Sequence, residues 1–137
     1  GLALEALPDA LTLRWEAGEG AERSAASAAV PLEPGTREAT LTVYASGAHN
    51  ALASERWGYQ VWLEWTCLSE RDGRVIDSAR IELPLESDKE RARACAVSVR
   101  AEPEEPCRVQ ARVLVTPLDG ETAAGHLTLA DWEVSAR

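Results

Sequence analysis

Carboxylates are abundant in this chain but suggest no catalytic pair, and the other residues that could take part in catalysis are few. Among its 137 residues are two histidines, His49 and His126, and three cysteines. Neither histidine accompanies a nucleophile in a known motif, and the sequence has no G-x-S-x-G elbow, glycine-rich phosphate loop or H-E-x-x-H pair. The cysteines lack the C-x2-C spacing typical of zinc sites. We therefore predict no catalytic residues, no cofactor and no metal, and expect that the chain is not an enzyme.

The three cysteines, Cys67, Cys95 and Cys107, allow at most one internal disulfide bond. If successive strands run up and down, turns at 69–73 and 102–106 lie at one end of the domain, beside Cys67 and Cys107. Cys95 lies roughly 20 Å from that end, whereas a disulfide needs Cα atoms within about 7 Å. This topology permits only the Cys67–Cys107 pair, provided that the two strands are neighbours or face each other. The alternative is three reduced thiols that act as small core residues.

Trp62 is the residue best placed to bind a partner. It shares one face of a predicted strand with Gln60 and Glu64, so we expect an exposed indole beside an amide and a carboxylate. Such a ring can stack on a sugar or bind at the centre of a protein interface.

A hairpin around Asp72-Gly73 predicts the neighbours of Trp62. Its register pairs Leu63 with Ala79 and places Arg80 opposite Trp62, where a guanidinium can stack on the ring. A covered sheet surface, a protein contact and a carbohydrate contact are all compatible with this pair. The candidate binding residues are Trp62, Arg80, Tyr44, Trp57 and His49.

The elements that carry these residues show apolar and polar residues in alternation, which is typical of half-buried strands. This alternation predicts seven strands, with a β-bulge near Ala130-Asp131 where the parity changes. The same parity places Asp77 on the core side, opposite Trp65. Short strands without intervening helices favour an all-β fold, an antiparallel β-sandwich that is immunoglobulin-like or fibronectin-III-like. The predicted strands are 11–17, 40–45, 57–68, 74–85, 95–99, 107–116 and 127–134.

Two stretches lack this alternation. Residues 18–29 are rich in Gly, Ala, Glu and Ser and predict a long mobile loop, and 47–56 predict a second irregular loop. We expect one domain over residues 1–137, which presents the loops 18–37 and 46–56 at its surface.

The charge of the chain opposes two classes of partner. Its 23 carboxylates exceed its 14 basic residues, and the net charge is −9. Nucleic-acid binding needs a basic face that neutralises phosphates, so we expect no nucleic-acid partner. No apolar run reaches the roughly 18 to 20 residues that cross a bilayer, so we expect no membrane-spanning segment.

Taken together, these features predict a non-enzymatic protein-interaction or structural module of an extracytoplasmic, cell-surface or viral assembly. The alternative is a carbohydrate-binding domain that uses the face around Trp62. We expect a protein partner, with a glycan as the second candidate, and an extracytoplasmic location (periplasmic, secreted or surface).

Overall fold

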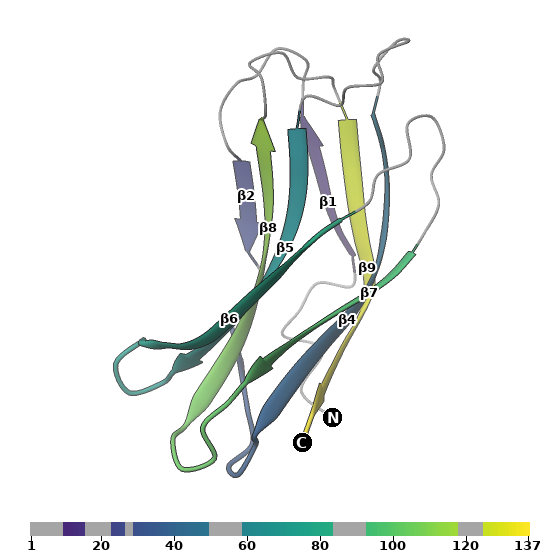
Figure 1. Ribbon diagram of the computed structural model, residues 1–137. Helices are drawn as coiled ribbons and strands as arrows, with labels where there is room; N and C mark the ends of the chain where they lie inside the picture. Colours follow the sequence, from purple (N-terminus) through teal and green to yellow (C-terminus); the bar gives the residue numbers. More distant parts are fainter. Residues whose placement is uncertain (1–9, 16–22, 27–28, 50–58, 84–92, 118–124) are drawn as a thin grey trace.

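The computed structural model describes residues 10–15, 23–26, 29–49, 59–83, 93–117 and 125–137. These residues form two antiparallel sheets packed face to face (Figure 1). All seven predicted strands are present, and two short strands, β2 and β3, are added to them. The strands are β1 (Ala10–Trp15), β2 (Arg23–Ala26), β3 (Val30–Pro31), β4 (Glu38–His49), β5 (Tyr59–Ser69), β6 (Val75–Glu82), β7 (Arg93–Arg100), β8 (Cys107–Pro117) and β9 (Gly125–Ala136).

The strand order defines the kind of sandwich. One sheet has the order β1-β9-β4-β7, and the other has β2-β8-β5-β6, with β3 also paired to β8. The predicted antiparallel β-sandwich is therefore confirmed, although its strand order is not that of the predicted immunoglobulin-like form, in which the sheets are A-B-E-D and C-F-G. The last strand, β9, lies between β1 and β4, which is the arrangement of jelly-roll sandwiches.

The core lies between the sheets and follows the predicted alternation. Leu63, Trp65 and Cys67 of β5 are fully buried, as are Leu41 and Val43 of β4 in the other sheet. The residues between them on each strand face outward, because successive side chains of a strand point to opposite sides. A hydrogen bond through the core joins the two sheets: the Trp65 Nε1 donates to the Ala39 carbonyl oxygen at 3.1 Å.

The predicted hairpin register is wrong by two residues. Leu63 pairs with Ile81 and not with Ala79, and Trp62 pairs with Glu82. One residue of the shift arises in the turn, where the Ser69 amide donates to the Arg74 carbonyl oxygen at 2.8 Å. The other arises at a bulge in β6, where the register slips beside Cys67 and Leu68. A shift of two keeps the parity, so the predicted faces of both strands are correct.

Asp77 does not lie opposite Trp65, because the same shift pairs it with Cys67. Its Oδ2 instead accepts a hydrogen bond from the Arg100 backbone N–H at 2.8 Å, and the Arg100 guanidinium lies 3.7 Å away. Arg100 belongs to β7, the edge strand of the opposite sheet. The Asp77 carboxylate thus accepts a hydrogen bond from a backbone N–H at a sheet edge. Unpaired N–H groups at such an edge favour association with another chain.

The predicted loops are shorter than expected. Residues 23–26, within the stretch predicted as a mobile loop, form β2, and Ala25 pairs with Val113 of β8. Residues 30–31 form β3, and β4 continues to His49, which pairs with Gly125. Strands of two to four residues are too short to show a period in the sequence. Neighbouring backbone supplies their hydrogen bonds.

The predicted bulge in β9 is confirmed. Thr42 pairs with Glu133 but Tyr44 pairs with Ala130, so Asp131 and Trp132 together oppose one residue of β4. Asp131 has a φ of 54°. The extra residue changes the parity and keeps Trp132 buried in the core.

This backbone conformation predicts the result of two substitutions. Asp131→Val is expected to lower the free energy of unfolding by about 1–2 kcal/mol, because a β-branched residue is strained at positive φ. Asp131→Gly is expected to stay within about 0.5 kcal/mol of the wild type, since glycine adopts positive φ without a clash. Urea unfolding measures both, and equal losses for the two variants would contradict the bulge geometry.

Candidate functional site

The outer face of β8, β5 and β6 carries two of the five candidate binding residues, Trp62 and Arg80. The strand register aligns their neighbours in rows across the sheet. One row holds Arg112, Glu64 and Arg80, and the adjacent row begins with Leu114 and Trp62. Glu82 completes the second row, so the face combines an indole, two carboxylates and two guanidinium groups.

Trp62 and Arg80 are in contact, although they are not direct partners in the register. The Arg80 guanidinium lies 5.0 Å from the centroid of the Trp62 ring, within the range of a cation–π interaction. Arg80 is paired with Glu64, so the contact runs diagonally between the two strands. The predicted stacking of Arg80 on Trp62 is confirmed. The prediction that Arg80 lies directly opposite Trp62 is wrong, because Arg80 reaches the ring from the diagonal position. The guanidinium covers one face of the ring, which is half-buried.

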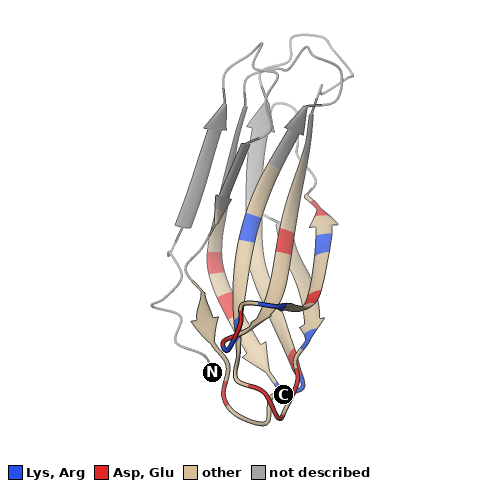
Figure 2. Cartoon of the chain, turned by 90° about the vertical axis from the view of Figure 1, so that its left-hand side faces the viewer, with Lys and Arg blue, Asp and Glu red and all other residues tan. Residues whose placement is uncertain are grey.

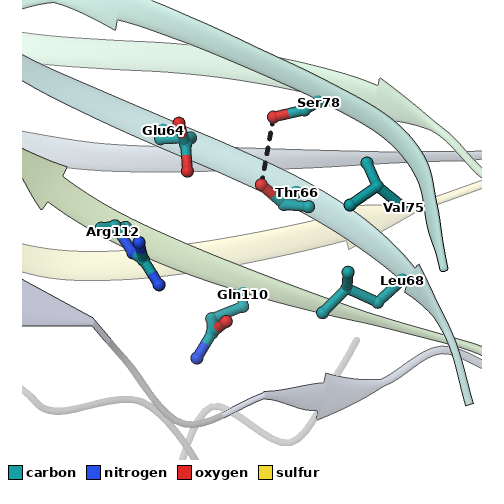
Figure 3. Close-up of a pocket in the computed structure, with 7 residues that line it drawn as sticks. All are labelled: Glu64, Thr66, Leu68, Val75, Ser78, Gln110 and Arg112. Atoms are coloured by element: carbon teal, nitrogen blue, oxygen red, sulfur yellow. Dashed lines mark hydrogen bonds between the residues drawn. The ribbon is translucent and has the colours of Figure 1, made fainter. Parts of the chain in front are cut away.

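A shallow hollow of about 250 Å³ lies beside this pair on the same face. Glu64 and Arg112 line one end, and Leu68 and Val75 line the other (Figure 3). Between the two ends, the hydroxyl groups of Thr66 and Ser78 are hydrogen-bonded at 3.1 Å, and Gln110 completes the lining. Val75 is 55% exposed, which is unusual among the large aliphatic side chains that the structure describes.

The charged groups at the hollow are available to a partner. Within the described part of the chain, no ion pair joins Glu64 to Arg112 or Arg80. By contrast, Arg74 and Arg137 each contact a carboxylate. Figure 2 shows basic and acidic residues interspersed along the strands, with acidic residues gathered in the turns near the C-terminus. The outer face thus presents mixed charge to a partner.

Of the remaining candidate binding residues, the structure describes the side chain of Tyr44, which does not join this face. Tyr44 is 45% exposed, as predicted, but it lies on β4 in the other sheet, so Tyr44 and Trp62 face opposite sides of the sandwich. His49 ends β4, and its side chain lies outside the described residues, as does the whole of Trp57.

Sequence reasoning missed most of the hollow. Gln110 and Arg112 lie on the polar side of the strand predicted at 107–116, so parity could have assigned them to an outer face. Parity could not show that β8 pairs with β5, and so could not bring Arg112 beside Glu64. The bulge that turns Val75 outward left no signal in the sequence.

Cys67 and Cys107 lie on neighbouring strands of one sheet, as the disulfide prediction required. Cys67 pairs with Val109 and Cys107 pairs with Ser69, so the two cysteines are diagonal neighbours. Both are buried thiols in this structure. Burial raises the pKa of Cys67 to about 12, and the nearby Cys107 adds to the effect through its charge and a hydrogen bond. Cys95 lies on β7 in the other sheet.

The described residues contain neither a metal-binding cluster nor a membrane-spanning helix. No group of three or more His, Cys, Asp or Glu side chains there is arranged to hold a metal ion. None of those residues forms a helix long and apolar enough to span a membrane.

Comparison with known proteins identifies the fold but no family. Neither a protein-family model nor a curated protein matches the sequence. The structure is similar to a chain of the infectious bursal disease virus Gt strain, with a TM-score of 0.59, 7% identity and coverage of 94% of this chain and 30% of that chain. It is also similar to the enzymatically active domain of tailspike protein 4 of bacteriophage CBA120, with a TM-score of 0.51, 11% identity and coverage of 94% and 19%.

A CBM4 structure is 16% identical to this chain, and the alignment covers 99% of this chain and 88% of the CBM4 chain. Its TM-score of 0.42 is too low to show a shared fold. Identities this low show a shared sandwich fold alone. This chain spans less than a third of the virus and phage chains that it matches.

Proposed function

We propose that this chain is a non-enzymatic interaction or structural module that binds a protein partner through the outer face of β8, β5 and β6. The observation that carries the proposal is the Arg80–Trp62 pair beside a hollow whose carboxylate and guanidinium form no ion pair with the described residues. Aromatic and arginine side chains are enriched at the centres of protein interfaces. The exposed Val75 and half-buried Leu68 add apolar surface that a partner can cover.

The covered indole favours a protein partner over a neutral sugar. Sugar binding by stacking needs an open ring face, whereas the Arg80 guanidinium occupies one face of Trp62. A protein partner can pack against the stacked pair without displacing Arg80. The fold supports a role in an assembly, since similar structures include a virus and a VP2 subviral particle. We accordingly propose an extracytoplasmic or virion-associated location.

A carbohydrate-binding domain is the second candidate. The hollow is lined by two hydroxyl groups, an amide, a carboxylate and a guanidinium, which are groups that hydrogen-bond sugar hydroxyls. Such a ligand would lie in the hollow and extend past Glu64 toward Trp62, which lies on the same face of β5.

Site-specific photo-crosslinking in the native assembly or cell tests the first proposal. A photoreactive residue is placed at Thr66, on the floor of the hollow, and in a matched variant at Thr42, on the outer face of the other sheet. We expect a discrete crosslinked protein from position 66 and none from position 42. Arg112→Glu in the position-66 variant is expected to reduce that crosslink at least about tenfold. Crosslinks from position 42 alone would overturn the proposed binding face.

A glycan array separates the protein-binding candidate from the carbohydrate-binding candidate. If a glycan binds the wild type but not Trp62→Ala, the carbohydrate-binding function is supported and the protein-binding function is overturned.

A further inference from the structure

Cys67 and Cys107 form a pair of thiols enclosed at one end of the sandwich. Cys67 is fully buried and Cys107 is 3% exposed. Their strands are hydrogen-bonded neighbours, and the two cysteines occupy diagonal positions in the register. The pair lies where β5 ends and β8 begins, beside the turns 70–74 and 101–106 (Figure 1).

The turn at 101–106 covers this thiol pair. The Cys107 Sγ lies 3.1 Å from the Glu105 carbonyl oxygen and 3.7 Å from that of Glu102. The Glu105 carboxylate holds the turn in place, because it accepts hydrogen bonds from Arg74 at 2.8 Å and from the Ser69 hydroxyl at 3.1 Å. We refer to Glu105 and its two hydrogen-bond partners, Ser69 and Arg74, as the latch.

The closed latch opposes oxidation of the pair. Diagonal neighbours in an antiparallel sheet have Cα atoms about 7–8 Å apart, slightly beyond the roughly 7 Å that a disulfide spans. A bond between them requires the start of β8 to move about 1 Å toward β5, and the latched turn restrains that movement. Burial and the raised pKa of Cys67 also keep its thiolate scarce.

We propose that Cys67 and Cys107 are a latched dithiol, which closes to a disulfide when the contact of Glu105 with Arg74 and Ser69 opens. The oxidant is a low-molecular-weight disulfide such as glutathione disulfide. One cysteine thiolate attacks it to form a mixed disulfide and release one glutathione. The second cysteine then displaces the other glutathione, so that two thiols are oxidised and one disulfide is reduced to two thiols. The resulting disulfide joins β5 to β8. It also lowers the conformational entropy of the unfolded chain, which stabilises the folded state.

The rate of oxidation of the folded protein tests this proposal. The reduced full chain is incubated with glutathione disulfide, quenched by alkylation and mapped by mass spectrometry without reduction. Glu105→Gln removes the charge of the latch and is expected to form the Cys67–Cys107 bond about ten times faster than the wild type. Glu38→Gln is the matched control, because it breaks the ion pair with Arg137, which lies 3.0 Å from Glu38, and it is expected to match the wild-type rate.

Global unfolding is separated from opening of the latch by measuring the urea stability of each variant. The proposal requires an acceleration larger than the change in the unfolding equilibrium constant. Arg74→Gln removes the same contact from the other side and must act in the same direction. The proposal is overturned if either latch variant fails to oxidise faster than Glu38→Gln, or if glutathione bound at Cys95 is the only product.

Discussion

Replacing Trp65 with alanine is expected to lower the free energy of unfolding by about 4–5 kcal/mol, near the upper limit for a core truncation. Trp65 is the largest fully buried side chain in the described residues. Its loss leaves a cavity between the sheets, and it also removes the hydrogen bond from its indole to the Ala39 carbonyl oxygen across the core. Because this loss approaches the total stability of many domains, urea unfolding should show a largely unfolded protein.

Two variants separate the contributions to that loss. Trp65→Phe keeps most of the buried ring but leaves the Ala39 oxygen without this donor, and is expected to cost about 2–3 kcal/mol. Trp62→Ala, on the outer face of the same strand, is expected to cost less than about 1.5 kcal/mol. If Trp62→Ala destabilises the protein as much as Trp65→Ala, the assignment of inner and outer faces is wrong.

Raising the pH from 8 to 11 is expected to destabilise the reduced protein by about 2–3 kcal/mol. Burial is the main reason that the pKa of Cys67 rises from 9.0 to about 12, and the neighbouring Cys107, Asp77 and Glu102 increase the effect. The folded state therefore holds the thiol proton more tightly than the unfolded state does. This contribution to stability is fully present below pH 9 and is lost as the pH rises from about 9 to 12.

Urea unfolding at each pH, with a reducing agent present, measures this dependence. Cys67→Ala is expected to flatten the dependence between pH 8 and 11, even though its stability at pH 8 is also lower. Cys95→Ala serves as the control and should keep the wild-type slope. If Cys67→Ala keeps the wild-type dependence of the free energy of unfolding on pH, a group other than Cys67 causes the loss of stability.

The candidate site was predictable in part. Alternation along β5 placed Trp62 and Glu64 on one polar face, and the parity of β6 placed Arg80 on the same face. The contact between Trp62 and Arg80 was predicted from a wrong register, and it persists because a long side chain reaches its diagonal neighbour. Tyr44 was grouped with these residues by its exposure, yet its strand belongs to the other sheet. Exposure of a side chain does not reveal which surface it joins.

By itself, the sequence determined which side chains of each long strand face the core, because burial of apolar groups separates the two sides of a strand at every second residue. It also determined that Cys67 and Cys107 lie near the same end, since strand length and direction follow from the turns. Only the tertiary structure decided that β8 lies beside β5 and β9 beside β4. Strands pair through backbone N–H and C=O groups that almost every residue carries, so the partner of a strand is selected by the packing of the whole core.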